Sequence, residues 1–171
     1  GDGGGLLARG SVGRPLIVDI ADCDFSNNYN AQGGGLYMGR YATGTIQRCR
    51  FHANTAYLQG GAACKGGLYP ENIGETAVFE YCEFVANQAG IDEVGVESTD
   101  LGRGGAVCTR LAPRTEFYNC TFVNNVVHGP LMRGDAIMHP QEGGVFDSDD
   151  LRCVIVNCAF YGTVGNHVQV F

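Results

Sequence analysis

Residues 79–87 read Phe-Glu-Tyr-Cys-Glu-Phe-Val-Ala-Asn, and close copies of this stretch recur along the whole chain. Each copy contains Cys-x-Phe, with an apolar residue three positions before the cysteine. The five pairs are Cys23/Phe25, Cys49/Phe51, Cys82/Phe84, Cys120/Phe122 and Cys158/Phe160. Four copies have an asparagine five positions after the cysteine: Asn28, Asn54, Asn87 and Asn125. Recurrence at a fixed internal spacing indicates a stacked repeat.

A glycine-opened segment of small residues follows each of the first four copies. These segments are 33–37, 60–64, 104–108 and 134–138, and residues 3–7 have the same form, as if from a preceding incomplete unit. The spacing between successive column cysteines is 26, 33, 38 and 38 residues. Repeats that are constant in their strands and variable in length carry their insertions in the connections.

The alternation within each copy predicts short strands rather than helices. Cysteine and phenylalanine alternate with polar residues at period two, so both point to one face, while the three-residue step to the upstream apolar position requires a bend. Each unit is predicted to be strand, bend, strand, asparagine turn, glycine-opened strand and return loop. Such a circuit buries its inner face only by stacking on others. This favours a parallel β-helix; an antiparallel sandwich stays open as an alternative but does not explain the recurring offsets.

Gly-Gly-Ala-Val, as at 104–107, followed by Cys-x-Phe-x-x-Asn, as at 120–125, resembles the repeats of polymorphic outer membrane protein (Pmp) type adhesins. More broadly it is similar to right-handed parallel β-helices of the pectate-lyase-like superfamily. The resemblance covers nearly the whole chain and implies an all-β, right-handed parallel β-helix (solenoid) of about five coils with loop insertions. Thr163 in place of the turn asparagine and Asp135 in place of the second glycine depart from the pattern. The matched residues serve stacking, so they imply a fold rather than a function.

Length, charge and hydropathy limit the domain organisation and the classes of binding partner. The 171 residues are expected to form a single β-helix domain, 1–171, as a segment of a longer chain or assembly. The net charge is −7 and there is one lysine, Lys65, so we expect no nucleic acid partner. No apolar run is long enough for a direct membrane span. Because the uncapped ends of a β-helix invite pairing, other protein subunits or flanking coils are expected at both helix ends.

The repeated inward residues are interpreted as structural ladders packed in the core. Stacked asparagines can hydrogen-bond along the column and tolerate a left-handed turn conformation. Neighbouring parallel strands lie about 4.8 Å apart, whereas a disulfide needs Cβ atoms about 3.8 Å apart, so the five column cysteines are expected to be reduced. Cys64, Cys108 and Cys153 lie outside that column, and their pairing stays open.

Charged residues point outward beside the cysteine column. Asp24, Arg50 and Glu83 follow successive cysteines, and Asp22 and Arg48 precede them. Alternating signs on adjacent coils predict cross-strand ion pairs. They also argue against an enzyme, which would gather several carboxylates. Lys65 is assigned to an insertion.

Two insertions, 90–103 and 139–152, are rich in acids. Asp147, Asp149 and Asp150 could offer oxygen ligands to calcium, although a solvated acidic loop explains them equally well and the segment lacks the spacing of an EF-hand. No other cofactor is expected. Asn119-Cys120-Thr121 fits the N-glycosylation pattern, which favours an extracellular or cell-surface location. The four histidines share no metal-ligand spacing: His52, His128, His139 and His167.

The leading hypothesis is a non-enzymatic structural or adhesive segment of an extracellular or cell-surface protein or filament assembly. The alternative is a polysaccharide lyase or glycoside hydrolase, or a carbohydrate-binding β-helix, so carbohydrate is a further candidate partner. Aromatic platforms for a sugar would come from tyrosines: Tyr29, Tyr37, Tyr41, Tyr57 and Tyr69.

Overall fold

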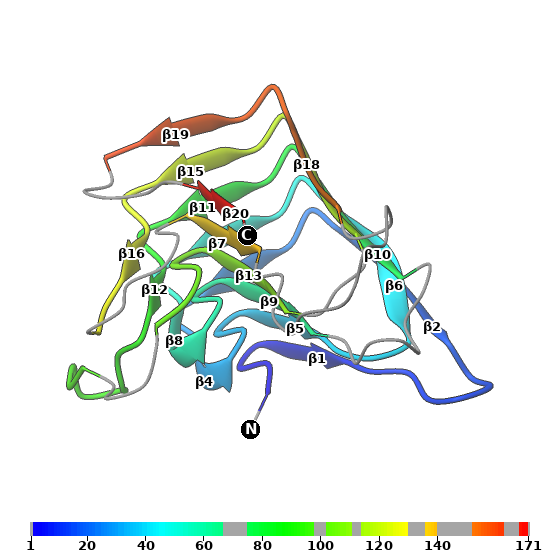
Figure 1. Cartoon of the computed structure of the whole chain (residues 1–171), viewed down its shortest axis with the longest axis horizontal. Coiled ribbons are helices and arrows are strands. Elements are labelled where there is room, and N and C mark those ends of the chain that lie inside the picture. Colours follow the sequence, from blue (N-terminus) through cyan, green and yellow to red (C-terminus); the bar gives the residue numbers. More distant parts are fainter. Residues whose placement is uncertain are drawn as a thin grey trace.

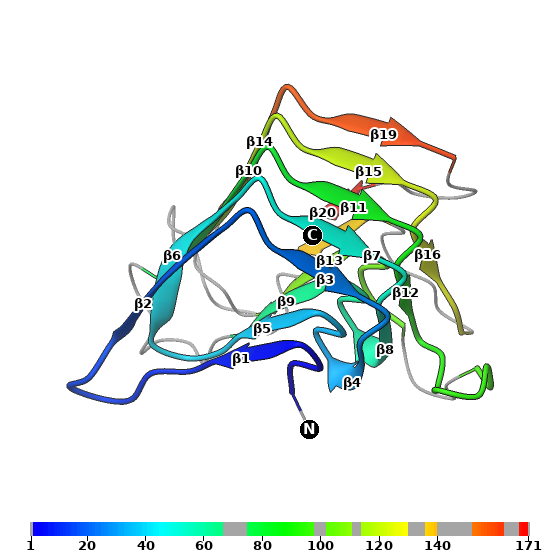
Figure 2. The same cartoon turned by 180° about the vertical axis from the view of Figure 1, so that it is seen from behind.

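The structure is a computed structural model that describes residues 2–66, 75–97, 102–110, 114–129, 136–139, 152–162 and 168–170. Every regular element in this part of the chain is a strand, and all strand pairs are parallel. The chain winds through successive coils that stack along one axis (Figures 1 and 2). A parallel β-helix, as the repeat predicts, is the result.

Four sheets enclose the core, each contributing one strand to a complete coil. Sheet I contains β2 (Leu16–Ala21), β6 (Ala42–Gln47), β10 (Thr76–Glu80), β14 (Arg114–Tyr118) and β18 (Arg152–Val156). Sheet II contains β3 (Asp24–Ser26), β7 (Arg50–His52), β11 (Glu83–Val85), β15 (Thr121–Val123) and β19 (Ala159–Tyr161). Sheet III contains β4 (Tyr29–Gln32), β8 (Thr55–Gln59), β12 (Gln88–Ala89) and β16 (Val126–Val127). Sheet IV contains β1 (Leu6–Ala8), β5 (Leu36–Met38), β9 (Ala63–Gly66), β13 (Val107–Arg110), β17 (Ile137–His139) and β20 (Val168–Val170).

Sheet III was not predicted from the sequence. The repeat predicted three strands in each coil, and sheet III adds a fourth. Its strands follow the ladder asparagines and are as short as the two residues of β12 (Gln88–Ala89). Ala56 and Ala89 face the core in register with each other. Two residues are too few for a period-two pattern, so the alternation that marks the other strands is not visible here.

In the described residues, positive-φ residues make three kinds of corner in the coils. The first corner is the residue just before the column cysteine: Asp22, Arg48, Tyr81, Asn119 and Asn157. The second is the residue before the ladder position: Asn27, Ala53, Ala86, Asn124 and Gly162. The third is the glycine that opens sheet IV: Gly3, Gly33, Gly60 and Gly104. One left-handed residue explains the three-residue step between sheets I and II. The left-handed conformation predicted for the ladder asparagines is wrong, because the preceding residue adopts it.

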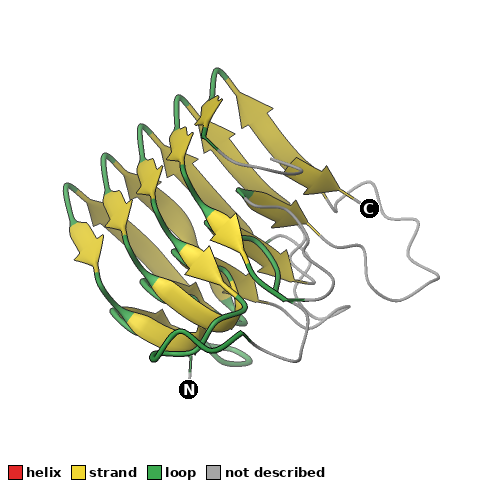
Figure 3. Ribbon diagram, turned by 90° about the vertical axis from the view of Figure 1, so that its left-hand side faces the viewer, coloured by secondary structure: helices red, strands yellow, loops and turns green. Residues whose placement is uncertain are grey.

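The coils stack one above another (Figure 3), and phenylalanine rings on sheets I and II form two columns in the core between them. In sheet II the rings of Phe51 and Phe84 stack with centroids 5.0 Å apart, and those of Phe84 and Phe122 are 4.7 Å apart. In sheet I, Phe79 stacks on Phe117 at 5.2 Å and meets Phe84 edge to face. Offset stacks and T-shaped pairs are both favourable for aromatic rings. The repeat therefore makes one continuous aromatic core.

Core packing is incomplete at the two ends of the Cys-x-Phe columns, which corrects the prediction that all five pairs lie within the core. Phe160 stacks on Phe122 with centroids 4.8 Å apart, so it does point inward, but it is only partly buried, as is Cys158. At the opposite end, Phe25 is partly buried and Cys23 is exposed. The reason is position in the stack: β3 and β19 are the outermost strands of sheet II among the described residues, whereas each inner strand of that sheet is covered on both sides.

Candidate functional site

The four ladder asparagines join into one hydrogen-bonded column inside the second corner. Asn54 Nδ2 donates to Asn87 Oδ1 at 3.0 Å and to the carbonyl of Phe25 at 2.7 Å. The backbone N–H of Asn54 also donates to Asn87 Oδ1, at 3.0 Å. Asn28 and Asn125 continue the same pattern at the two ends. Since Asn54, Asn87 and Asn125 are fully buried, the column satisfies backbone groups that would otherwise be unpaired.

The cysteine column has a bonding role that the sequence did not reveal. The Cys82 thiol donates to the carbonyl of Glu80 across its own bend (3.4 Å) and to that of Ile46 in the preceding coil (3.3 Å). The thiols of Cys49, Cys120 and Cys158 donate in the same two ways, to a carbonyl of their own bend and to one of the preceding coil. Cys23 donates to the carbonyl of Ala21 in its own coil. Burial raises the pKa of Cys49 to about 11. The column thiols therefore satisfy bend carbonyls.

The other three cysteines occupy two different surroundings. Cys153 faces inward on β18 and packs partly buried against the core, and burial raises its pKa to about 11. Cys64 and Cys108 are in register on β9 and β13, with Tyr37 of β5 next in the row. These three form a separate buried cluster. All eight cysteines are free thiols.

Lys65 is part of the core, and its assignment to an insertion is wrong. It lies on β9 in register with the buried Met38, and its side chain is 1% exposed. Its Nζ donates to Glu75 Oε2 at 2.7 Å and to the carbonyls of Gly39 and Gly66, each at 3.2 Å. Three acceptors for the three ammonium hydrogens compensate much of the cost of burying the charge. Burial lowers the pKa of Lys65, while the bond to Glu75 opposes this. An inward ammonium fully engaged in this way supports the coil rather than facing a substrate.

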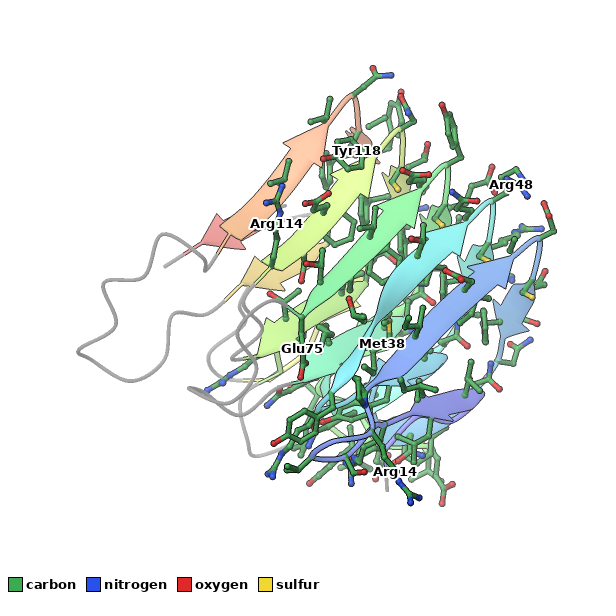
Figure 4. All side chains as sticks on the ribbon, turned by 90° about the vertical axis from the view of Figure 1, so that its right-hand side faces the viewer. Arg14, Met38, Arg48, Glu75, Arg114 and Tyr118 are labelled. Carbon is green, nitrogen blue, oxygen red and sulfur yellow. The ribbon has the colours of Figure 1, made fainter. Side chains whose placement is uncertain are left out.

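Charged side chains line the outside of the first corner. Arg48 makes two bonds to the Asp22 carboxylate, both 2.7 Å long, and Figure 4 shows Arg48 projecting at that edge. The bond to Arg48 lowers the pKa of Asp22. Arg50 and Glu83 approach to 3.9 Å. Both pairs join adjacent coils, so neither leaves a convergent group of carboxylates.

The outer face of sheet I carries polar side-chain pairs. Figure 4 shows Arg114 and Tyr118 projecting from β14. Both contact Glu116, whose Oε2 accepts a 3.0 Å bond from the Tyr118 hydroxyl. Between neighbouring coils, Gln47 Nε2 donates to Glu80 Oε2 at 2.7 Å. The polar side chains named here therefore bond to one another on the surface of the sheet.

Tyr29 lies beside the described part of the first acidic insertion, on the outside of sheet III. Its side chain is 38% exposed. Burial raises the pKa of Tyr29, and the charges of Glu93 and Asp92 act in the same direction. Asp92 shapes this loop, because its Oδ1 accepts the backbone N–H groups of Val94 (3.0 Å) and Val96 (2.7 Å). An exposed aromatic ring next to carboxylates is thus present at one place on the outer surface.

The other tyrosines proposed as sugar-stacking platforms differ in how exposed their rings are. Tyr57 is half-buried on β8 and contributes to the electrostatic surroundings of Tyr29. Tyr37 is only 8% exposed, with Arg9 stacked over its ring at 5.8 Å, which leaves it no open face. Tyr41 is a half-buried turn residue with positive φ. Tyr69 lies outside the described residues.

The calcium candidates Asp147, Asp149 and Asp150 also lie outside the described residues, as does His167. Within the described ranges, no three or more His, Cys, Asp or Glu side chains gather as a metal site. The other histidines are dispersed, His52 on β7, His128 against Gln88 (3.1 Å) and Glu97 (3.7 Å), and His139 on β17.

Asn119, the candidate glycosylation site, is the corner residue of its coil. Its side chain is half-buried, and its Oδ1 accepts a 2.6 Å bond from Asn157 Nδ2 of the next coil. The amide already has a structural partner.

The family model described as "Right handed beta helix region" matches residues 2–171. The chain belongs to this right-handed β-helix family. Together with the all-parallel sheets, the match confirms the predicted all-β, right-handed parallel β-helix. No curated protein and no solved structure matches the chain. None of the described segments is a helix with the length and apolar character to cross a membrane.

Proposed function

We propose that this chain is a non-enzymatic structural or adhesive β-helix segment of an extracellular or cell-surface protein or filament assembly. One observation carries the proposal: the repeated residue types are occupied in holding the coils together. Phenylalanines stack, asparagine amides bond along their column, and column thiols donate to bend carbonyls. Outward charges pair between coils instead of converging. The resemblance to Pmp-type adhesin repeats adds support for an adhesive use.

The first-coil end of the stack supports pairing with another coil or subunit. Among the described strands, β1 bonds only to β5, and β2 only to β6, so each has one open edge. Apolar side chains there are exposed: Leu7 by 49% and Ile17 by 72%. No lysine or proline protects the strand edge formed by β1. A further β-coil, from the same polypeptide or a neighbouring subunit, would satisfy these backbone groups and cover the apolar side chains.

Sedimentation velocity across a concentration series tests this pairing. We expect the 171-residue chain to associate, and Leu7→Lys or Ile17→Lys to shift it toward monomer by placing a charge on the open edge. Val94→Lys is the matched control, because Val94 is 77% exposed but lies on the lateral insertion. A wild-type chain that stays an 18.2 kDa monomer at high concentration would remove the main support for a building block.

Carbohydrate binding is the second candidate function, favoured by Tyr29 beside the acidic loop. A tyrosine ring can stack on a sugar face while neighbouring carboxylates accept hydroxyl hydrogen bonds. The negative charges of Asp92 and Glu93 would favour neutral sugars over acidic polysaccharides. The site would therefore bind a glycan without cleaving it.

Affinity electrophoresis in gels containing a neutral or an acidic polysaccharide distinguishes these functions. Retardation by the neutral polymer, reduced by Tyr29→Ala but not by Tyr161→Ala, is expected for the second candidate; Tyr161 is 60% exposed on sheet II. Loss of acidic polymer with appearance of unsaturated ends would instead support a lyase. No retardation and no cleavage would leave the structural proposal standing alone.

A further inference from the structure

We propose that Cys64 and Cys108 form a two-coordinate binding site for a soft d10 metal ion, with Cu(I) as the ion we would test. The site lies on the outer face of sheet IV and is independent of the proposed function. It uses two cysteines that belong to neither of the repeated inward columns.

The geometry of adjacent parallel strands suits this coordination. Cys64 and Cys108 are directly in register on β9 and β13, so their side chains leave the sheet on the same side. Neighbouring strands lie about 4.7–4.9 Å apart. A metal–thiolate bond is about 2.3 Å long, so two thiolates on opposite sides of one ion lie about 4.6 Å apart. Two in-register cysteines thus span the distance of a linear S–metal–S unit, whereas a disulfide would require them to move closer.

Their hydrogen bonding sets these two thiols apart from the cysteine column. Each buried column thiol donates to backbone carbonyls, as Cys82 does to Ile46 and Glu80. Removing its proton would place a thiolate against carbonyl oxygens. The Cys108 thiol instead donates to a side chain, Gln59 Oε1, at 3.7 Å. A glutamine amide can turn its NH2 donor toward a thiolate, which a backbone carbonyl cannot do. Both protons can be replaced by a metal ion without breaking a bend.

The surroundings favour a low coordination number and a soft ion. Cys64 is 1% exposed and Cys108 is fully buried, with Tyr37 completing the cluster. Soft thiolate ligands select Cu(I), Zn²⁺ and Fe–S clusters. Zinc and Fe–S sites take three or four protein ligands, so a site with two thiolates favours Cu(I). The binding reaction is two thiols plus Cu(I) giving a bis-thiolate copper complex of charge −1 and two released protons.

Proton release gives the site a defined pH dependence. Metal and protons compete for the same sulfur atoms, so the apparent affinity must fall as pH decreases. Other charged groups nearby are Lys65, on the opposite face of β9 and paired with Glu75, and Asp2, paired with Arg9.

Anaerobic titration with Cu(I), buffered by bathocuproine disulfonate, tests the proposal on the reduced 171-residue chain. One high-affinity ion per chain is expected, with at least about 100-fold weaker binding in Cys64→Ser and in Cys108→Ser. Cys49→Ser is the control, because it removes a buried column thiol and should keep the affinity. Wild-type affinity in both Cys64→Ser and Cys108→Ser would overturn the assignment.

X-ray absorption of the wild-type chain loaded with one Cu(I) gives a second measurement that does not depend on a variant folding. Two sulfur neighbours at equal distance are expected. Three or more sulfur neighbours, or oxygen and nitrogen ligands, would place the ion elsewhere and overturn the two-coordinate site.

Discussion

The first and third coils contain the same repeated residues in very different surroundings. In the third coil Cys82 is 1% exposed, and Phe84 and Asn87 are fully buried, because coils lie on both sides of it. In the first coil, Cys23 is exposed and Phe25 only partly buried. Residue type and corner geometry are shared, so the neighbouring coil is what provides burial. Stability in a stack of repeats is accordingly a property of interfaces.

The largest difference between the two coils is expected from Phe84→Asp and Phe25→Asp. An aspartate at 84 would be buried between Phe51 and Phe122 with no partner, so cooperative folding should be lost. At 25 the carboxylate can reach solvent past the open edge, and the chain should fold with a lowered Tm. Thermal melts followed by circular dichroism measure both variants; a wild-type melt for Phe84→Asp would disprove the inward register.

Lys65→Met sharpens the comparison, because methionine occupies the same register in the coil before, at Met38. The change leaves the buried Glu75 carboxylate without its cation, which should cost about 3–5 kcal/mol in free energy of unfolding. Adding Glu75→Gln should recover most of that loss, since the second change removes the unpaired charge. Urea denaturation of the two variants measures this; equal stabilities would mean that the ion pair is not the cause.

Asn87→Ala and Asn28→Ala compare the middle and the edge of the asparagine column. Asn87 Oδ1 accepts from Asn54, and its Nδ2 donates to Asn125 and to the Phe51 carbonyl. Losing these buried bonds should cost about 2–4 kcal/mol, from about 1–3 for each unsatisfied group. Asn28→Ala should cost clearly less, because that side chain is only part-buried. Similar losses in urea unfolding would contradict the dependence on neighbouring coils.

The smallest effect is expected at the exposed ion pair between the first two coils. Asp22 has a lowered pKa through its bond to Arg48. A lowered carboxyl pKa adds stability above the unfolded value, near pH 4, and that contribution is lost as pH falls through the folded value. Asp22→Asn should therefore lower the Tm slightly at pH 7 and low salt, and not at pH 2 or in 1 M salt. A constant difference across these conditions would point to packing rather than charge.

The sequence was sufficient to predict the inward columns of sheets I and II, because each strand there is long enough to show alternating inward and outward residues. Ile46 and Cys49, either side of one corner, were assigned inward from spacing alone, and both are buried. Sheet III was missed because its shortest strands have two residues. Lys65 was misplaced because it is charged and next to glycines, a local signal that suggests a loop; the carboxylate that accepts it, Glu75, is ten residues away.

By itself the sequence determined the all-β class, the stacking period and the inward columns, since these follow from residue types recurring at constant offsets. It also indicated a bend, through the three-residue step between two strands, and a turn at the repeated asparagine. The tertiary structure alone decided how deeply each copy is buried, as the partly buried Phe160 and the enclosed Phe84 show. It also decided which groups meet between coils: thiols with bend carbonyls, Lys65 with Glu75, and Cys64 with Cys108. The reason is physical, because such contacts join positions separated by variable insertions and depend on the register set when the coils stack.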